Sequence, residues 1–154
     1  MPFSSSRPTN IVKVIIGLHS LLLQVLNDDP KWQSSDVKLV KELRVSVTGR
    51  IEKDAPNMLH ADFANMYVGG GVLSSGCVQE EILFVLCPEL IVSRLLTEVL
   101  DDNETLVITG YQRFSDYVGY GWSFRWNGDY VDSTGCDAWG RHTTQLVAMD
   151  ALVP

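Results

Sequence analysis

The hydrophobic and polar positions of this chain change their spacing several times, and each spacing predicts a different element. Residues 10–26 form a long apolar stretch starting at Asn10, a good N-cap, and predict a buried amphipathic helix. Residues 43–49 alternate apolar and polar side chains, which is typical of a half-buried strand. Residues 58–64 and 105–110 predict two more strands, the second of them buried.

A helical period dominates the middle of the chain. Residues 79–86 predict a short helix, and Pro88, which suits the first turn of a helix, predicts the start of the next. Ile91, Leu95 and Val99 then recur at four-residue spacing, as they would on the apolar face of that second helix.

The remaining pattern completes an alternation of strands and helices. Residues 54–57 predict a turn, and residues 122–126 and 145–152 predict further strands. Several strands are apolar on both sides, so the expected fold class is α/β, with a mixed sheet that helices cover on both faces. Ligands of such sheets lie over loops and helix N-termini at the carboxyl ends of strands, where the loop at 69–78 is expected.

The apolar stretch at 11–26 also allows two other interpretations, a membrane span or a signal peptide. It is shorter than the ~20 residues that a membrane span needs. It also lacks a convincing cleavage site of small residues. We therefore expect no membrane association and keep the buried helix, preceded by a loose tail at residues 1–9.

Composition narrows the classes of partner. The chain has 154 residues and a formal net charge of −7, which argues against a face that wraps DNA or RNA. Its three cysteines are an odd number without C-x-x-C spacing, which favours reduced thiols in an intracellular compartment over a disulfide framework or a zinc site.

The most informative stretch runs from Gly69 to Glu81. Three consecutive glycines are costly to order, so they are expected where the backbone bends tightly or a ligand lies against it. Consecutive N–H groups of such a turn, together with a helix N-terminus, suit a pyrophosphate. The alternative is simpler: carboxylates in the first turn of a helix cap it, and on residue types alone capping is favoured.

The two glutamates cannot have equivalent roles. Adjacent helical residues project about 100° apart, so Glu80 and Glu81 are not expected to flank one glycosidic bond as a pair. One general acid/base with a helper that grips hydroxyl groups fits this geometry better. The acid needs a raised pKa, which partial burial and a neighbouring carboxylate would provide.

The spacing of Gly69-Gly70-Gly71, seven residues, and Gln79-Glu80-Glu81 resembles the signature of the poly(ADP-ribose) glycohydrolase family. The resemblance covers about residues 32–152. Further similar segments are Asp62-Phe63-Ala64-Asn65, Tyr67-Val68, Pro88-Glu89-Leu90-Ile91, Ser93-Arg94-Leu95, Thr97-Glu98-Val99-Leu100, Ile108-Thr109-Gly110, Ser115, Tyr117, Gly119-Tyr120 and Ala148-Met149-Asp150-Ala151-Leu152.

This resemblance implies a macrodomain-like fold and hydrolysis of the ribose–ribose O-glycosidic bonds of poly(ADP-ribose), with release of ADP-ribose. It implies that Glu81 is the acid/base, that Glu80 orients ribose hydroxyls and that Asp62 belongs to the same acidic set. No metal and no cofactor is expected, because nearby negative charge stabilises an oxocarbenium-like centre. The implied partner is poly(ADP-ribose) or ADP-ribose in the nucleus, the cytoplasm or both.

The resemblance also implies substrate-binding positions. Asn65 is expected to bond ribose, the glycines to line the site, and Tyr120 to pack over the bound ADP-ribose. The positions on the adenosine side are Ile51, Glu52 and Gln79, and the loop glycines are Gly69, Gly70 and Gly71.

Each of these residues also has a structural interpretation. Asp62 and Asn65 are equally suited to forming a turn, and Ile51 and Tyr120 to packing in a core. Cys77 and His60 are expected to be packed side chains, without a role as nucleophile or base.

The chain divides by this interpretation into residues 1–31, a tail and accessory helix, and residues 32–154, a partial catalytic domain. It ends at Pro154, before a later glycine-rich loop that clamps the diphosphate in the family. We therefore expect an incomplete, less stable domain. Two alternatives to hydrolysis remain: a remnant that at most binds ADP-ribose, and an unrelated anion-binding α/β protein whose glutamates only cap a helix.

Overall fold

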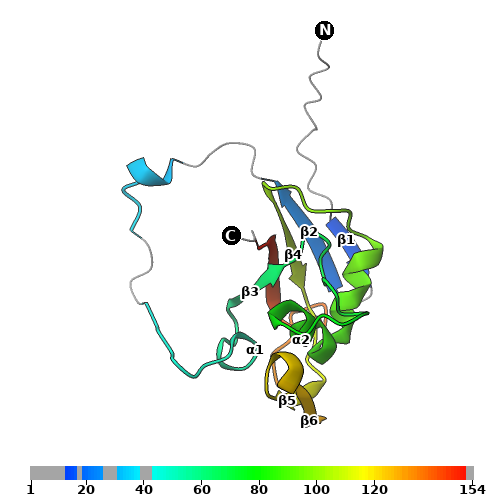
Figure 1. Ribbon diagram of the computed structural model, residues 1–154. Coiled ribbons are helices and arrows are strands. Elements are labelled where there is room, and N and C mark those ends of the chain that lie inside the picture. Colours follow the sequence, from blue (N-terminus) through cyan, green and yellow to red (C-terminus); the bar gives the residue numbers. More distant parts are fainter. Residues whose placement is uncertain (1–12, 17–18, 26–30, 39–42, 152–154) are drawn as a thin grey trace.

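The computed structural model describes residues 13–16, 19–25, 31–38 and 43–151. Within them the chain forms strands and short helices (Figure 1). The elements are β1 (Lys13–Ile16), β2 (His19–Val25), η1 (Trp32–Ser34), α1 (Ile51–Asp54), β3 (Leu59–Ala64), α2 (Gln79–Leu86), η2 (Pro88–Leu95), β4 (Glu104–Thr109), β5 (Ser115–Val118), η3 (Gly121–Ser123), β6 (Arg125–Asp129) and β7 (Gln145–Asp150), where η denotes a 3-10 helix.

Five of these strands form one mixed sheet in the order β1-β2-β4-β7-β3. The pair β3–β7 is parallel, whereas β1–β2, β2–β4 and β4–β7 are antiparallel. Strands β5 and β6 form a separate antiparallel ribbon, drawn at the bottom of Figure 1. The expected α/β class with a mixed sheet and flanking helices is confirmed.

The core lies between the sheet and helices α2 and η2. Strand β4 alternates buried and half-buried side chains, and β3 buries every second residue, as strands with one well-covered face do. The core side chains from α2 and the sheet include Phe84, Leu86, Leu106, Ile108 and Leu146, each at most 2% exposed. On β3 and β4, only one face is therefore buried as deeply as was expected for both faces of the sheet.

The helix expected at residues 10–26 is wrong wherever the structure describes that stretch. Residues 13–16 and 19–25 are strands that pair with each other, and β2 pairs along its length with β4. Residues 10–12, 17–18 and 26 lie outside the described residues. Pairing with the edge of β4 outweighs the helical pattern, because strand preference depends on the neighbours a segment meets.

The strand expected at residues 43–49 is also wrong, since residues 43–48 belong to no helix or strand. Leu43, Val45 and Val47 are each at least 84% exposed. A period-two pattern specifies a strand only when another strand is available to pair with it, and the described residues offer none here.

Three of the other expected strands are confirmed with shifted boundaries. The expected strands at 58–64, 105–110 and 145–152 correspond to β3, β4 and β7, although residue 152 lies outside the described residues. The stretch 122–126 instead contains η3 and the start of β6. The expected turn at 54–57 begins one residue later, because Asp54 closes α1.

The helix expected to start at Pro88 does so, but it is a 3-10 helix that ends at Leu95. With three residues per turn, Leu90 and Ser93 face the core and Leu95 is 83% exposed. The chain then leaves the helix, and the Leu100 N–H donates to the Met66 carbonyl at 2.9 Å. Val99 is therefore outside the helix on which it was expected.

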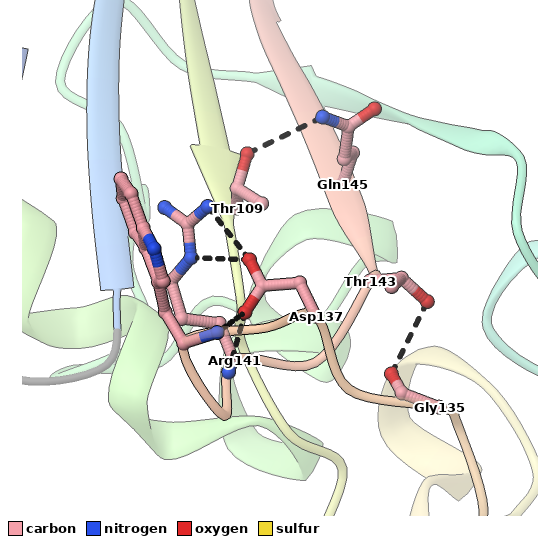
Figure 2. A network of polar contacts seen from close by, with 7 residues as sticks. Thr109, Gly135, Asp137, Arg141, Thr143 and Gln145 are labelled. Atoms are coloured by element: carbon pink, nitrogen blue, oxygen red, sulfur yellow. Dashed lines mark hydrogen bonds and ion pairs between the residues drawn. The ribbon is translucent and has the colours of Figure 1, made fainter.

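A polar network shapes the loop that leads into β7 (Figure 2). Arg141 forks onto Asp137 through Nε at 2.8 Å and Nη2 at 2.7 Å, and its guanidinium lies over the Trp139 ring. The Thr143 hydroxyl donates to the Gly135 carbonyl at 3.2 Å. These contacts set the direction in which the chain enters the strand. No helix in the described residues is long and apolar enough to cross a membrane.

Candidate active site

Asp62 is the most buried acidic residue of the site. It lies on β3 next to Ala148 of β7, and its side chain is fully buried. Neither carboxyl oxygen has a hydrogen-bond partner among the described residues. Burial first, and then the neighbouring Glu80 and Glu81 carboxylates, raise the pKa of Asp62 to about 8. Asp62 is therefore protonated at neutral pH.

Glu80 is held at the carboxyl end of β3. It occupies the first turn of α2, is 3% exposed, and accepts hydrogen bonds from the backbone N–H groups of Asn65 and Gly69. Burial raises the pKa of Glu80, while these two backbone donors oppose the rise. The carboxylate is thus buried but bonded on both oxygens.

Glu81 is held by a different set of donors. Its Oε1 accepts the Gly71 N–H at 3.0 Å and its Oε2 accepts the Val78 N–H at 3.0 Å. The second bond is one half of a capping box, from the third helical residue back to the N-cap. The expected capping role is real, yet the first bond reaches across to the glycine loop.

The glycine loop fits against both carboxylates without room for side chains. A Cβ on Gly70, where φ is +46°, would lie 2.4 Å from Glu81 Oε1 and 2.6 Å from Glu80 Oε2. A Cβ on Gly76 would lie 2.6 Å from the Glu81 carboxyl carbon. Two glycines are therefore needed for close approach of the backbone to the carboxylates.

The expectation that glycine-loop N–H groups hold a pyrophosphate is not met in this structure. Gly69 and Gly71 donate to Glu80 and Glu81, and Gly70 donates to the Tyr67 carbonyl at 2.9 Å. The groups that these loop N–H donors bind are the carboxyl oxygens of the protein's own glutamates. The three glycines thus line the site by shaping it.

We call Asp62, Glu80 and Glu81 the acidic wall. It lies where the chain leaves β3 and where α2 begins, which is the place that the alternating pattern predicted for a ligand site. The two glutamates bond different backbone groups, which agrees with the expected difference in their orientation.

Asn65 and Gln79 flank the acidic wall. The Asn65 side chain is exposed, and its Oδ1 accepts the Tyr67 N–H at 3.0 Å, so the turn-forming role is realised. The Gln79 amide accepts from the Phe63 N–H at 3.0 Å and donates to the Ala61 carbonyl at 3.1 Å. Gln79 therefore pairs with the free edge of β3 as a neighbouring strand would.

The residues expected on the adenosine side meet in one small cleft, which we call the tyrosine cleft. Ile51 and Glu52 come from α1, Gln79 from α2 and Tyr120 from the start of η3. The cleft is lined by Ile51, Glu52, Gln79, Ile82, Leu83, Leu86, Tyr117 and Tyr120. Three segments far apart in sequence thus contribute to one surface.

Tyr117 was not expected as a site residue, but it orients this cleft. Its hydroxyl donates to Glu52 Oε1 at 2.8 Å, and the Arg50 guanidinium lies 4.5 Å from its ring centroid. Burial, followed by the hydrogen bond to Glu52, raises the pKa of Tyr117 to about 12. Tyr117 therefore remains a hydrogen-bond donor to Glu52 throughout the neutral range.

Tyr120 is 56% exposed, so it is not the core aromatic of the alternative interpretation. The next residue links its loop to α2, because Cys77 Sγ donates to the Gly121 carbonyl at 2.9 Å. Cys77 is partly buried and packs against the core, in agreement with its expected structural role. Its bond ties the segment before α2 to the Tyr120 loop.

A second cavity of about 320 Å³ shares Glu52 with the tyrosine cleft. Buried His60 lines it, with Nε2 donating to the Ala55 carbonyl at 2.8 Å and Nδ1 2.6 Å from the Tyr111 hydroxyl. His60 is thus a packed histidine, as expected. Cys87 also lines the cavity, and burial raises the pKa of its thiol.

No group of three or more His, Cys, Asp and Glu side chains in the described ranges could hold a metal ion. Arg94 is a further residue that sequence reasoning did not assign to the site. Its Nη1 donates to the Gly70 carbonyl at 3.0 Å, so it contacts the glycine loop from η2. Neither Arg94 nor Tyr117 carries a local signal, because both contacts join segments distant in sequence.

Comparison with known proteins identifies the family. Residues 29–153 match the family described as poly(ADP-ribose) glycohydrolase with a macro domain fold. The chain is 50% identical over 121 residues to poly(ADP-ribose) glycohydrolase 1 of Arabidopsis thaliana, covering 79% of this chain and 22% of that protein. It is 40% identical over 121 residues to the probable poly(ADP-ribose) glycohydrolase 2 of that species, covering 79% and 23%.

A relative from an animal agrees. The chain is 37% identical over 127 residues to poly(ADP-ribose) glycohydrolase 2 of Caenorhabditis elegans, covering 79% of this chain and 26% of that protein. The chain spans about a quarter of the length of the curated relatives it matches, or less. The match includes the acidic wall and the tyrosine cleft, and the chain belongs to the poly(ADP-ribose) glycohydrolase family.

Proposed function

We propose that this chain hydrolyses the ribose–ribose O-glycosidic bonds of poly(ADP-ribose) and releases ADP-ribose inside the cell. One observation carries the proposal: two adjacent buried glutamates take different backbone donors beside a third, unpaired and protonated carboxyl group. A capping glutamate alone would need neither the glycine loop nor Asp62. Membership of the family supports the same substrate.

In the proposed reaction Glu81 is the acid/base. Its protonated carboxyl gives a proton to the leaving ribose oxygen as the bond from that oxygen to the anomeric carbon breaks. The oxygen departs as a hydroxyl of the shortened polymer, and positive charge develops on the anomeric carbon. The Glu81 carboxylate then takes a proton from water, whose oxygen bonds to the anomeric carbon, and Glu81 is again protonated.

Glu80 and Asp62 have supporting roles in this proposal. Glu80, fixed by Asn65 and Gly69, accepts hydrogen bonds from ribose hydroxyls and places the sugar. Asp62 is uncharged at neutral pH, so it adds no negative charge to the site. Nearby negative charge favours the oxocarbenium-like transition state.

The tyrosine cleft is proposed to bind the adenosine part of the substrate. Glu52, oriented by Tyr117, offers a carboxylate acceptor to the base, and Ile51 offers an apolar contact. The exposed ring of Tyr120 is available to pack over the bound ADP-ribose. Asn65, with its exposed side chain, is proposed to bond ribose.

Labelled poly(ADP-ribose) tests the proposal with the purified chain. Release of ADP-ribose by the parent chain is expected, with loss of at least a thousandfold in Glu81→Gln, an order of magnitude suggested by removal of an essential acid/base group. Glu98→Gln, outside the site, is the matched control and is expected to keep the parent rate. Saturable ADP-ribose binding without release would instead favour the binding remnant.

A further inference from the structure

Arg94 contacts the glycine loop from η2. It is half-buried near the end of η2, and its Nη1 donates to the Gly70 carbonyl at 3.0 Å. Its aliphatic part also packs closely, because a Cβ on Gly69 would lie 3.1 Å from Arg94 Cδ. The absence of a side chain at Gly69 thus lets the arginine approach the loop.

The peptide group that Arg94 contacts is the same one that holds Glu81. The Gly70 carbonyl accepts from Arg94, and the N–H of the same peptide, which belongs to Gly71, donates to Glu81 Oε1 at 3.0 Å. A trans peptide is planar, with its C=O and N–H pointing in opposite directions. Arg94 and Glu81 therefore grip the two ends of one rigid unit.

This peptide needs an external restraint. Gly69 and Gly70 have φ of +92° and +46°, and a glycine on either side of a peptide leaves that peptide free to rotate at little steric cost. Hydrogen bonds in series also polarise one another, so a cationic donor at the carbonyl strengthens the bond that the N–H makes to a carboxylate. The positive charge of Arg94 further lowers the pKa of Glu80 against the effect of burial.

We infer that Arg94 is a positioning residue for Glu81, acting through the Gly70–Gly71 peptide. The role of Glu81 rests on the proposed function, whereas the coupling of Arg94 to Glu81 does not. Arg94 orients the Gly71 N–H toward Glu81 Oε1 and so sets the direction of that carboxyl group. No contact between Arg94 and the substrate is required.

Two measurements on the full chain test this inference separately from the proposed function. The first follows the Gly71 amide by NMR in protein labelled with 15N-glycine. Arg94→Gln is expected to move that amide proton upfield and to speed its hydrogen exchange about tenfold, as loss of roughly one hydrogen bond would. Glu81→Gln shifts the same resonance, and Arg125→Gln, an exposed arginine on β6, leaves it unchanged.

The second measurement is the pH profile of poly(ADP-ribose) hydrolysis. Arg94→Gln is expected to lower kcat about ten- to hundredfold and to move the pH limb of kcat, with a smaller change in KM, as misplacement of a catalytic group does. Arg94→Lys, which retains a donor and the charge, is expected to restore part of kcat. If Arg94→Gln fails to fold, the lysine variant supplies both measurements.

The outcomes are distinguishable. A Gly71 amide that responds to Glu81→Gln but not to any Arg94 variant overturns the inference, whatever the activity. An inactive parent chain counts against the proposed function, yet a shifted Gly71 amide in Arg94→Gln still supports the coupling. A loss of activity confined to KM would contradict a positioning role.

Discussion

The acidic wall and the tyrosine cleft lie on neighbouring parts of α2 but are built in opposite ways. The wall is buried, and four backbone N–H groups hold its two glutamates before any substrate arrives. In the cleft, Glu52 is oriented by a side-chain hydrogen bond from Tyr117, and the Tyr120 ring is more than half exposed. The difference indicates that chemistry needs a preorganised surface, whereas recognition here uses side chains that can still adjust.

After the loss of Glu81 itself, the largest effect is expected from closing the space between the glycine loop and the acidic wall. Gly70→Ala would place a methyl group 2.4 Å from Glu81 Oε1 at a φ of +46°. We expect kcat to fall by about a hundredfold or more and stability by about 1–3 kcal/mol. Assays of hydrolysis and urea unfolding check both values.

Gly140→Ala is the control for that change. Gly140 also has a positive φ, +78°, but an added Cβ would meet nothing within 4 Å. It should lose stability without losing activity. If both variants lost activity equally, the loss in Gly70→Ala would not come from the contact of its methyl group with the acidic wall.

The next effect is a pH dependence of stability, and it is expected from the acidic wall alone. The folded-state pKa of Asp62 is about 8 against an ordinary 3.8, so the native state binds a proton that the unfolded state releases. The contribution of Asp62 to the free energy of unfolding should therefore be fully present below about pH 4. It should fall as the pH rises and level off above about pH 8. The expected slope approaches about 1.4 kcal/mol per pH unit.

Asp62→Asn should remove this slope, since asparagine is uncharged at every pH. Urea unfolding of both proteins between pH 5 and 8 measures the difference. If the free energy of unfolding changed with pH equally in both proteins, Asp62 would not be the group that binds the extra proton in the native state.

A smaller effect is expected in the cleft. Tyr120→Ala should raise KM for poly(ADP-ribose) about tenfold with kcat changed little, because stacking of a base on an aromatic ring is worth about 1–3 kcal/mol. Trp139→Ala is the control, since Trp139 is 64% exposed and lies in the loop before β7. A drop in kcat at constant KM would mean that Tyr120 acts in the reaction step. The tyrosine cleft and the acidic wall would then not differ in role.

The smallest effect tests the link between the two regions. Cys77→Ala removes the bond from Sγ to the Gly121 carbonyl. A thiol is a weak donor, so KM should rise only about two- to threefold through a looser Tyr120 loop. Steady-state kinetics of this variant that instead resembled those of Glu81→Gln would mean that the two regions act as one unit.

The parts of the molecule that follow from local sequence were predictable. The apolar run after Gln79-Glu80-Glu81 predicts α2 with the bounds that the structure has, and β3 and β7 follow from short apolar stretches. The contact of the glycine loop with the glutamates was not predicted, since the sequence suggested that the loop N–H groups hold a pyrophosphate. The raised pKa of Asp62 could not be predicted, because it depends on how deeply the folded chain buries this side chain.

The predictions that failed concern segments whose structure depends on contacts with residues distant in the chain. The residues of β1 and β2 carry a helical pattern, but β2 pairs with β4 and β1 pairs with β2, so both are strands. Residues 43–48 carry a strand pattern without a partner strand in the described structure. Arg94 and Tyr117 likewise act through contacts with Gly70 and Glu52 that no local motif reveals.

We propose that the acidic wall performs the chemistry and that the tyrosine cleft performs the recognition. The most direct test measures ADP-ribose release from labelled polymer by Glu81→Gln after calorimetry has shown that this variant binds ADP-ribose as tightly as the parent. The account predicts unchanged binding with release reduced at least about a thousandfold. Undiminished release by a variant that binds normally would contradict it.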